Sequence, residues 1–114
     1  MLKIYEYANC STCKKALKFL DARKVKYVKL AIVETPPSLA ELKKMLAFVK
    51  DIKKLFNTSG LVYREMKLGL KLPSLTEAQA LKLLAENGKL IKRPFAISST
   101  SGFVGFKEVE WKQL

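Results

Sequence analysis

The chain has 114 residues and a formal net charge of +12 at pH 7, because 22 Lys and Arg residues outnumber 10 Asp and Glu residues. This length suits one domain with its own core. A composition of 49% hydrophobic and 28% charged residues is that of a globular protein rather than a disordered one. No run approaches the roughly 18 apolar residues of a membrane span, and no signal peptide pattern is present. We therefore expect a cytoplasmic protein without a membrane partner.

The basic charge favours anionic ligands and acidic protein surfaces. The lysines, however, are spread over several expected helices, as at Lys14, Lys15 and Lys18 and again at Lys43 and Lys44. Charges distributed in this way are typical of solvated helix faces. We do not expect direct binding to nucleic acid.

The N-terminal third predicts a β-α-β unit. Residues 3–7 have the pattern of a short strand, residues 9–11 form a turn, and apolar residues then recur at helical spacing up to Leu20. A second β-rich run, residues 27–33, ends before Pro36-Pro37. Strands joined through one helix are parallel, with a right-handed crossover.

The middle of the chain, about residues 38–88, predicts a helical insert. Ser38 and Thr76 each begin a capping box, with Glu41 and Gln79 three residues later. The helix that begins at Thr76 is expected to stop at Asn87-Gly88. The apolar face expected for the first helix consists of Leu39, Leu42, Leu46 and Val49.

The last section changes to a strand pattern. Residues 95–98 and 103–106 are strand candidates joined by a Ser/Thr/Gly turn, which suits an antiparallel hairpin. Residues 107–113 are expected to be helical. The order β-α-β, helical insert, β-β-α predicts an α/β protein of thioredoxin-like fold with a mixed sheet. No linker divides the chain, so residues 1–114 are expected to form a single domain.

The segment Cys10-Ser11-Thr12-Cys13 lies where the first strand passes into the first helix. A Cys10 sulfur at this point faces the unpaired amides of the helix N-terminus, including those of Ser11 and Thr12, and this stabilises a thiolate. Residues three apart in a helical turn also suit a disulfide. Cys13 is therefore a candidate to resolve a mixed disulfide on Cys10. We expect the Ser11 and Thr12 hydroxyls to cap the helix.

The same cysteines allow two other interpretations. They could be buried small hydrophobic residues, or they could be half of a zinc site. The chain has no histidine and no further cysteine, so four zinc ligands would require a dimer or carboxylates, and we expect no metal. The lack of histidine also excludes a Cys-His dyad, which leaves the helix dipole and nearby cations as activators.

Several motifs together resemble the arsenate reductase and Spx family over nearly the whole chain. They are Cys10-Ser11-Thr12-Cys13-Lys14-Lys15-Ala16, Phe56-Asn57-Thr58-Ser59-Gly60, Tyr63-Arg64, Leu90-Ile91-Lys92-Arg93-Pro94-Phe95 and Val104-Gly105-Phe106. The resemblance implies a thioredoxin-like fold with a helical insertion. It also implies Cys10 as nucleophile, Arg93 as an anion-binding arginine and Pro94 as a cis proline. The residues alone favour an ordinary trans proline at a strand entrance.

Other positions depart from the family's glutathione-dependent arsenate reductases, which resemble one another in three arginines around the oxyanion. Asn57 and Phe106 stand at the other two positions here, and Arg64 lies nearby in the sequence. Asn57 could line the site from the insert or only join two helical segments. Cys13 resembles instead the Cys-x-x-Cys switch of Spx-type regulators, which bind RNA polymerase.

These observations leave three functional hypotheses. The first is a thiol-disulfide oxidoreductase acting on a disulfide or oxyanion substrate. It has no bound cofactor, and its external reductant is glutathione or a redox protein partner of the thioredoxin or glutaredoxin system. The second is a redox-sensing transcriptional regulator of the Spx type, with RNA polymerase as partner. The third is an arsenate reductase.

Overall fold

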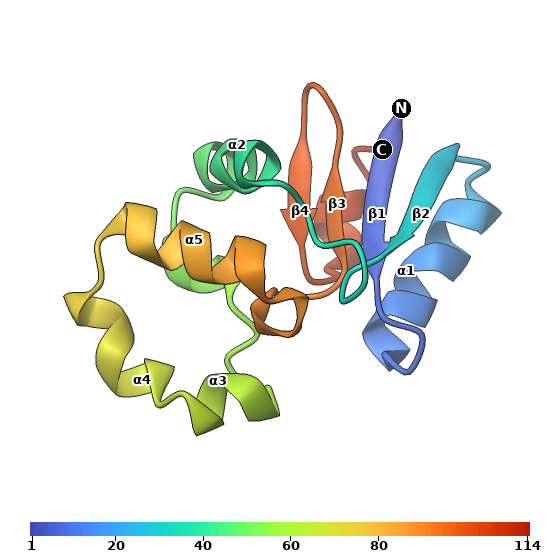
Figure 1. Cartoon of the computed structure of the whole chain (residues 1–114). Helices are drawn as coiled ribbons and strands as arrows, with labels where there is room; N and C mark the ends of the chain where they lie inside the picture. The colour runs from blue at the N-terminus through green and yellow to red at the C-terminus, as the bar shows by residue number, and fades with distance from the viewer.

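The computed structural model describes all of residues 1–114. Its centre is a four-stranded mixed sheet in the order β2-β1-β3-β4 (Figure 1). β1 (Leu2–Glu6) pairs in parallel with β2 (Tyr27–Ala31) and antiparallel with β3 (Phe95–Ile97), and β3 pairs antiparallel with β4 (Gly102–Val104). The expected order of elements and the thioredoxin-like α/β fold are confirmed.

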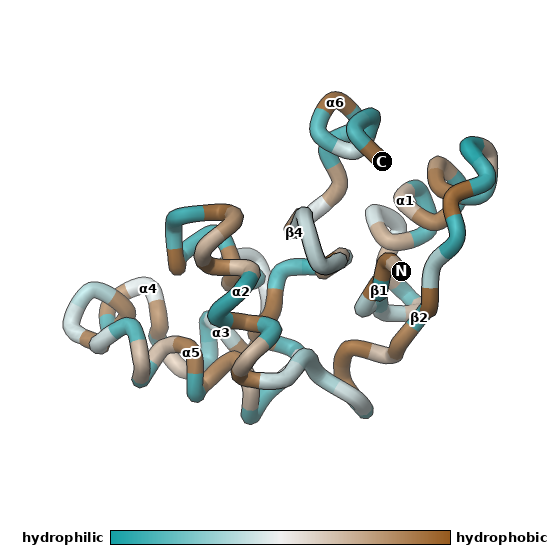
Figure 2. The backbone as a smooth tube through the Cα atoms, turned by 90° about the horizontal axis from the view of Figure 1, so that it is seen from above, coloured by the Kyte–Doolittle hydropathy of each residue, from teal (hydrophilic) through white to brown (hydrophobic).

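The sheet buries both faces, because successive side chains of a strand point to opposite sides. Leu2 and Ile4 of β1 pack against α1 (Ser11–Ala22) and α6 (Glu108–Trp111) in one buried cluster. Tyr5 belongs to the larger cluster on the other face, which the insert covers. The view from above shows α2 and α6 on opposite sides of β4 (Figure 2).

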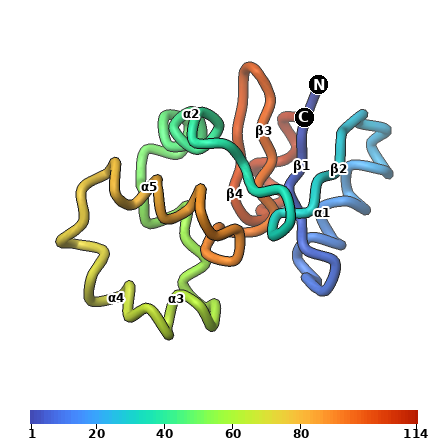
Figure 3. The backbone as a smooth tube through the Cα atoms, viewed as in Figure 1, coloured from blue at the N-terminus to red at the C-terminus, as the bar shows by residue number.

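The insert leaves the sheet after β2 and returns at β3, as the green-to-orange part of the tube shows (Figure 3). Its α-helices and 3-10 turns are α2 (Leu39–Val49), η1 (Ile52–Leu55), α3 (Leu61–Glu65), α4 (Leu68–Lys71), η2 (Leu72–Ser74), α5 (Glu77–Glu86) and η3 (Gly88–Leu90). Both expected capping boxes are present, at the first turns of α2 and α5. No helix in the molecule is long and apolar enough to cross a lipid bilayer.

The expected apolar face of α2 is wrong at one position. Leu42 and Met45 are fully buried, whereas the side chain of Leu39 is 42% exposed. Leu39 is the first residue of the helix and precedes the part of α2 that packs on β4 and α5. Helical spacing identified the apolar residues, but not which of them the neighbouring elements reach.

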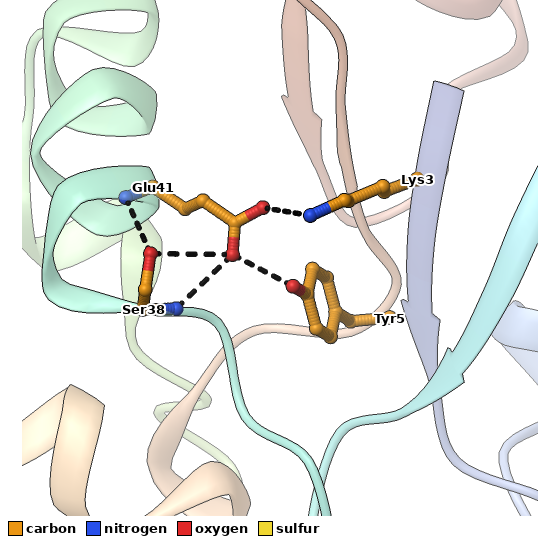
Figure 4. Close-up of polar contacts among 4 residues, drawn as sticks. All are labelled: Lys3, Tyr5, Ser38 and Glu41. Atoms are coloured by element: carbon orange, nitrogen blue, oxygen red, sulfur yellow. Dashed lines mark hydrogen bonds and ion pairs between the residues drawn. The ribbon is translucent and has the colours of Figure 1, made fainter. Parts of the chain in front are cut away.

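A hydrogen-bonded junction ties the start of α2 to β1 (Figure 4). The Glu41 carboxylate accepts bonds from the Tyr5 hydroxyl at 2.7 Å, the Lys3 ammonium at 3.2 Å and the Ser38 amide at 3.1 Å. Burial and the bond to Glu41 raise the pKa of the Tyr5 phenol. One carboxylate therefore serves both the helix cap and the sheet.

Candidate active site

Cys10 is the N-cap residue of α1. Its backbone is extended (φ −100°, ψ 114°), and its Sγ atom accepts a hydrogen bond from the Cys13 amide at 3.3 Å. Its own amide donates to the Tyr7 carbonyl at 3.0 Å, which fixes the turn between β1 and α1. A side chain in the N-cap position satisfies one of the free amides of the first turn. The half-buried Cys10 sulfur is therefore held at the positive end of the helix.

The expectation that the Ser11 or Thr12 hydroxyl caps α1 is wrong. The helix begins at Ser11, so Ser11 and Thr12 already lie inside its first turn, and the capping atom is the Cys10 sulfur. The Ser11 side chain is exposed and that of Thr12 is half-buried. The amide that donates to the sulfur is that of Cys13 rather than those of Ser11 and Thr12.

Cys13 lies beneath Cys10 on the inner face of α1. Its side chain is only 1% exposed, and both cysteines are free thiols. Burial, first, and the neighbouring Cys10 sulfur raise the pKa of the Cys13 thiol to about 12, against a smaller opposing effect of the Tyr7 backbone. The two sulfurs thus differ in character: one is half-exposed at a helix terminus and the other is buried and protonated at neutral pH.

The Arg93–Pro94 segment enters β3 beside this helix terminus. The peptide bond before Pro94 is cis, as the resemblance implied. Tyr5 pairs with Phe95 in the β1–β3 ladder, and extending this antiparallel register by two residues sets Arg93 opposite Tyr7. The Arg93 guanidinium carbon indeed lies over the Tyr7 ring, 4.6 Å from its centroid.

A short pairing with the insert holds the chain just before Arg93. Phe56 forms an isolated antiparallel bridge with Ile91. The Asn57 amide donates to the Leu90 carbonyl at 2.7 Å, and the Lys92 amide donates to the Leu55 carbonyl at 2.8 Å. The backbone of the half-buried Asn57 therefore lies beside the segment that leads to Arg93, although the two residues are distant in the sequence.

Two other sequence candidates are placed elsewhere. Arg64 is exposed on α3 and forms no ion pair; Lys3 with Glu41 is the one salt bridge of the molecule. The Phe106 ring packs against Phe19 and Trp111, with centroids 5.5 and 5.2 Å apart. Neither residue makes a hydrogen bond, ion pair or ring contact with Cys10, Tyr7 or Arg93, and Arg93 is the arginine held at the cysteine end of the sheet. No group of three or more His, Cys, Asp or Glu side chains converges anywhere in the chain.

Tyr7 is the site residue that the sequence reasoning missed. Its carbonyl accepts a hydrogen bond from the Cys10 amide, and its backbone also contacts the Cys13 thiol. The Arg93 guanidinium stacks on its ring. The signal that could have found it is the strand register. Once residues 3–7 and 95–98 are taken as antiparallel neighbours, Tyr7 and Arg93 fall at the same end of the sheet.

A mixed sheet with a helical insertion, a cysteine pair at the N-terminus of its first helix and a cis proline entering its third strand defines a thioredoxin-like fold of the ArsC kind. Residues 5–114 match the ArsC family. The chain belongs to this family.

Individual relatives agree with this assignment. The chain is 42% identical over 113 residues to the uncharacterized protein YusI of Bacillus subtilis, covering 98% of this chain and 96% of YusI. It is 31% identical over 111 residues to the global transcriptional regulator Spx of Enterococcus faecalis, covering 96% of this chain and 83% of Spx. A crystal structure of an ArsC family related protein from Bacteroides fragilis superposes with a TM-score of 0.94 at 43% identity, covering 98% of this chain and 95% of that one.

Proposed function

We propose that the protein is a thiol-disulfide oxidoreductase in which Cys10 is the nucleophile and Cys13 the resolving cysteine. The observation that carries the proposal is the contrast between the two sulfurs. Cys10 is half-exposed and caps α1 with its sulfur. Cys13, three residues later, is buried, and its amide donates a hydrogen bond to the Cys10 sulfur. A thiolate at a helix N-terminus is the reactive form in disulfide exchange.

The reaction proceeds in two exchanges. The Cys10 thiolate attacks one sulfur of a disulfide substrate, forms a mixed disulfide and releases the other sulfur as a thiolate, which takes up a proton. Cys13 then loses its proton to solvent and attacks the Cys10 sulfur, which releases the second substrate thiol and leaves a Cys10–Cys13 disulfide. An external thiol, such as glutathione or a thioredoxin or glutaredoxin, reduces this disulfide and completes the cycle.

Arg93 and Pro94 are assigned to substrate binding. The guanidinium is held over the Tyr7 ring at the same end of the sheet as Cys10, where its charge suits a carboxylate or an oxyanion on the substrate. Ser11 and Thr12, in the first turn of α1, are the neighbouring candidates for substrate contact. Asn57 is a further candidate through its position beside the arginine segment, whereas the position of Arg64 on α3 gives it no such support.

Trapping the mixed disulfide tests this proposal. The wild type, Cys10→Ser and Cys13→Ser proteins are incubated with glutathione disulfide and followed by mass spectrometry. We expect an intramolecular disulfide in the wild type, an accumulating glutathione adduct in Cys13→Ser and no reaction in Cys10→Ser. An adduct that forms equally well in Cys10→Ser would overturn the assignment of the nucleophile.

The 31% identity to Spx of Enterococcus faecalis supports a second candidate, a redox-sensing regulator that binds RNA polymerase. Here the Cys10–Cys13 disulfide would change the affinity for polymerase, without turnover. Binding of purified polymerase to the oxidised and reduced proteins distinguishes the two functions.

An arsenate reductase is the third candidate. It requires consumption of a thiol reductant that depends on arsenate, and the single arginine held beside the cysteines disfavours it.

A further inference from the structure

A groove with a volume of about 720 Å³ runs along β4, away from the cysteines. On one side of the sheet it is lined by Phe48 and Val49 of α2 and by residues of η1. On the other side it is lined by Lys107, which precedes α6, and by Glu110 of α6. Because β4 is the last strand of the sheet, a groove bounded by elements on both faces must wrap its free edge. Figure 2 shows these two helices on either side of β4.

The free edge of β4 offers backbone groups to the groove. The Ser98 amide donates to the Ser101 carbonyl and the Gly105 amide to the Pro94 carbonyl, both at 2.9 Å. In an antiparallel ladder, hydrogen-bonded and non-bonded pairs alternate. Counting inward from these two bonds, the N–H and C=O groups of Gly102 and Val104 point away from β3. An exposed strand edge of this kind is a template for another strand.

The two edges of the sheet differ in their protection. β2, the opposite edge, carries Lys29 in its middle, and a lysine on an edge strand discourages pairing. β4 is Gly-Phe-Val and has no charged residue of its own. Its lysines stand instead around the groove, where they can contact the side chains of a bound segment without blocking the edge.

The charges around the groove are mainly positive. Four lysines line it, Lys53, Lys54, Lys92 and Lys107, against two acidic residues, Asp51 and Glu110. The aromatic ring of Phe48, 36% exposed, and the half-buried Val104 add apolar surface between them. A ligand that fits has a hydrogen-bonding backbone and carries both acidic and apolar side chains.

We propose that the groove along β4 binds an extended segment of a partner protein that carries both acidic and apolar residues, and that this segment adds to the sheet as a fifth strand. Backbone hydrogen bonds to Gly102 and Val104 supply affinity, and the lysines and Phe48 supply specificity. Only β3 lies between β4 and β1, the strand that leads to Cys10, so that β4 and β1 are roughly 10 Å apart. The groove is thus a docking surface beside the cysteine site and does not depend on its chemistry.

Selection from a random eight-residue peptide display library tests the proposal. We expect enriched peptides that combine Asp or Glu with apolar residues. In the complex, hydrogen exchange of the Gly102 and Val104 amides should slow. Failure to enrich any peptide, enrichment of peptides without acidic residues, or protection at a different surface would each overturn the proposal.

Matched variants of the protein and the peptide sharpen the test. The double variant Lys53→Glu, Lys54→Glu should weaken binding about tenfold or more, because like charges then face each other. Lys29→Glu with Lys82→Glu makes the same charge change outside the groove and should have little effect.

N-methylation of the peptide tests the backbone hydrogen bonds. Methylation of the alternate amides that face β4 should abolish binding, whereas methylation of the other alternate amides, which point away from β4, should spare it. Binding by Cys10→Ser should equal that of the wild type, so the docking surface and the proposed redox function fail independently.

Discussion

Cys10 and Cys13 show how two identical side chains three residues apart acquire different chemistry. The N-cap position leaves the Cys10 side chain half-exposed, whereas Cys13, in the first turn of the helix, is buried. Burial comes first among the causes that raise the Cys13 pKa to about 12. A thiol in this state reacts slowly at neutral pH.

This contrast predicts different alkylation rates at pH 7. Cys13→Ser, which retains Cys10, should react with iodoacetamide at least about tenfold faster than Cys10→Ser, which retains the buried thiol. Mass spectrometry over time measures both rates. Removing Cys10 also removes its effect on Cys13, but the burial remains. Equal rates in the folded variants would contradict the assigned roles, and denatured samples, in which both thiols are accessible, serve as the control.

Glu41 provides a second prediction, on pH and stability. Partial burial alone would raise the pKa of its carboxyl, but the hydrogen bonds from Tyr5, Ser38 and Lys3 together lower it below the ordinary value of 4.5. A carboxyl whose pKa is lower in the folded state stabilises the fold above its unfolded pKa, and this stabilisation is lost as the pH falls through the folded value. The junction should therefore weaken below about pH 4.5.

The measurement is urea unfolding of the wild type and Glu41→Gln at pH 7 and pH 3. At pH 7 the substitution should cost about 1 kcal/mol or less, because the carboxylate is partly solvated. At pH 3 the difference should shrink. Glu77→Gln, in the first turn of α5, is the control for a helix-terminal charge without this junction. A difference that is unchanged between the two pH values would exclude a role for the Glu41 charge.

At the scale of elements, Gly88 near the end of the insert packs directly against the backbone of Ile32, the residue that follows β2. A Cβ atom at this position would lie 1.9 Å from the Ile32 carbonyl oxygen and 2.8 Å from its carbonyl carbon. Both are backbone atoms, which cannot move aside without shifting the strand end. The close approach places η3, and after it the arginine segment, against the sheet.

Gly88→Ala should therefore destabilise the protein by about 2 kcal/mol or more, in the range of overpacking in a filled core. Gly69 in α4 is the matched control, since a Cβ there has no atom within 4 Å. Gly69→Ala should be neutral or stabilise by up to about 1 kcal/mol, because it removes flexibility from the unfolded chain. Urea unfolding of both variants compares them directly. A Gly88→Ala protein as stable as Gly69→Ala would contradict the packing argument.

The local patterns in the sequence were sufficient for the four strands, the first helix, the two capped helices of the insert and the order of these elements, but not for α3, α4 and η2. Capping residues such as Ser38 and Thr76 located helix starts, and the Cys10-to-Cys13 segment was placed correctly at the end of β1. Contacts between distant segments were not predictable, because no local pattern encodes them. The Phe56–Ile91 bridge and the junction at Glu41 both join residues more than 30 apart, whereas the Arg93–Tyr7 contact could be derived only after β1 and β3 were paired.

The whole molecule carries a net charge of +12, and Cys10 is half-exposed at its surface. Such a field raises the local concentration of anionic reactants, and salt screens it. The reaction of Cys10 with glutathione disulfide, which is anionic, should slow by about tenfold between low and high salt. The reaction with neutral 2-hydroxyethyl disulfide should change little. Stopped-flow rates over a salt series measure both, and parallel salt dependences would exclude electrostatic attraction of the substrate.

The only tryptophan of the chain, Trp111, is fully buried on the α1 side of the sheet. Its indole N–H donates to the Gly105 carbonyl at 3.2 Å, and the Gly105 amide bonds in turn to the Pro94 carbonyl. Its ring also contacts Phe103 of β4, whose edge faces the groove. The protein thus contains a single tryptophan between its cis proline and its edge strand, and selective excitation of this fluorophore allows events at either place to be followed optically without a label.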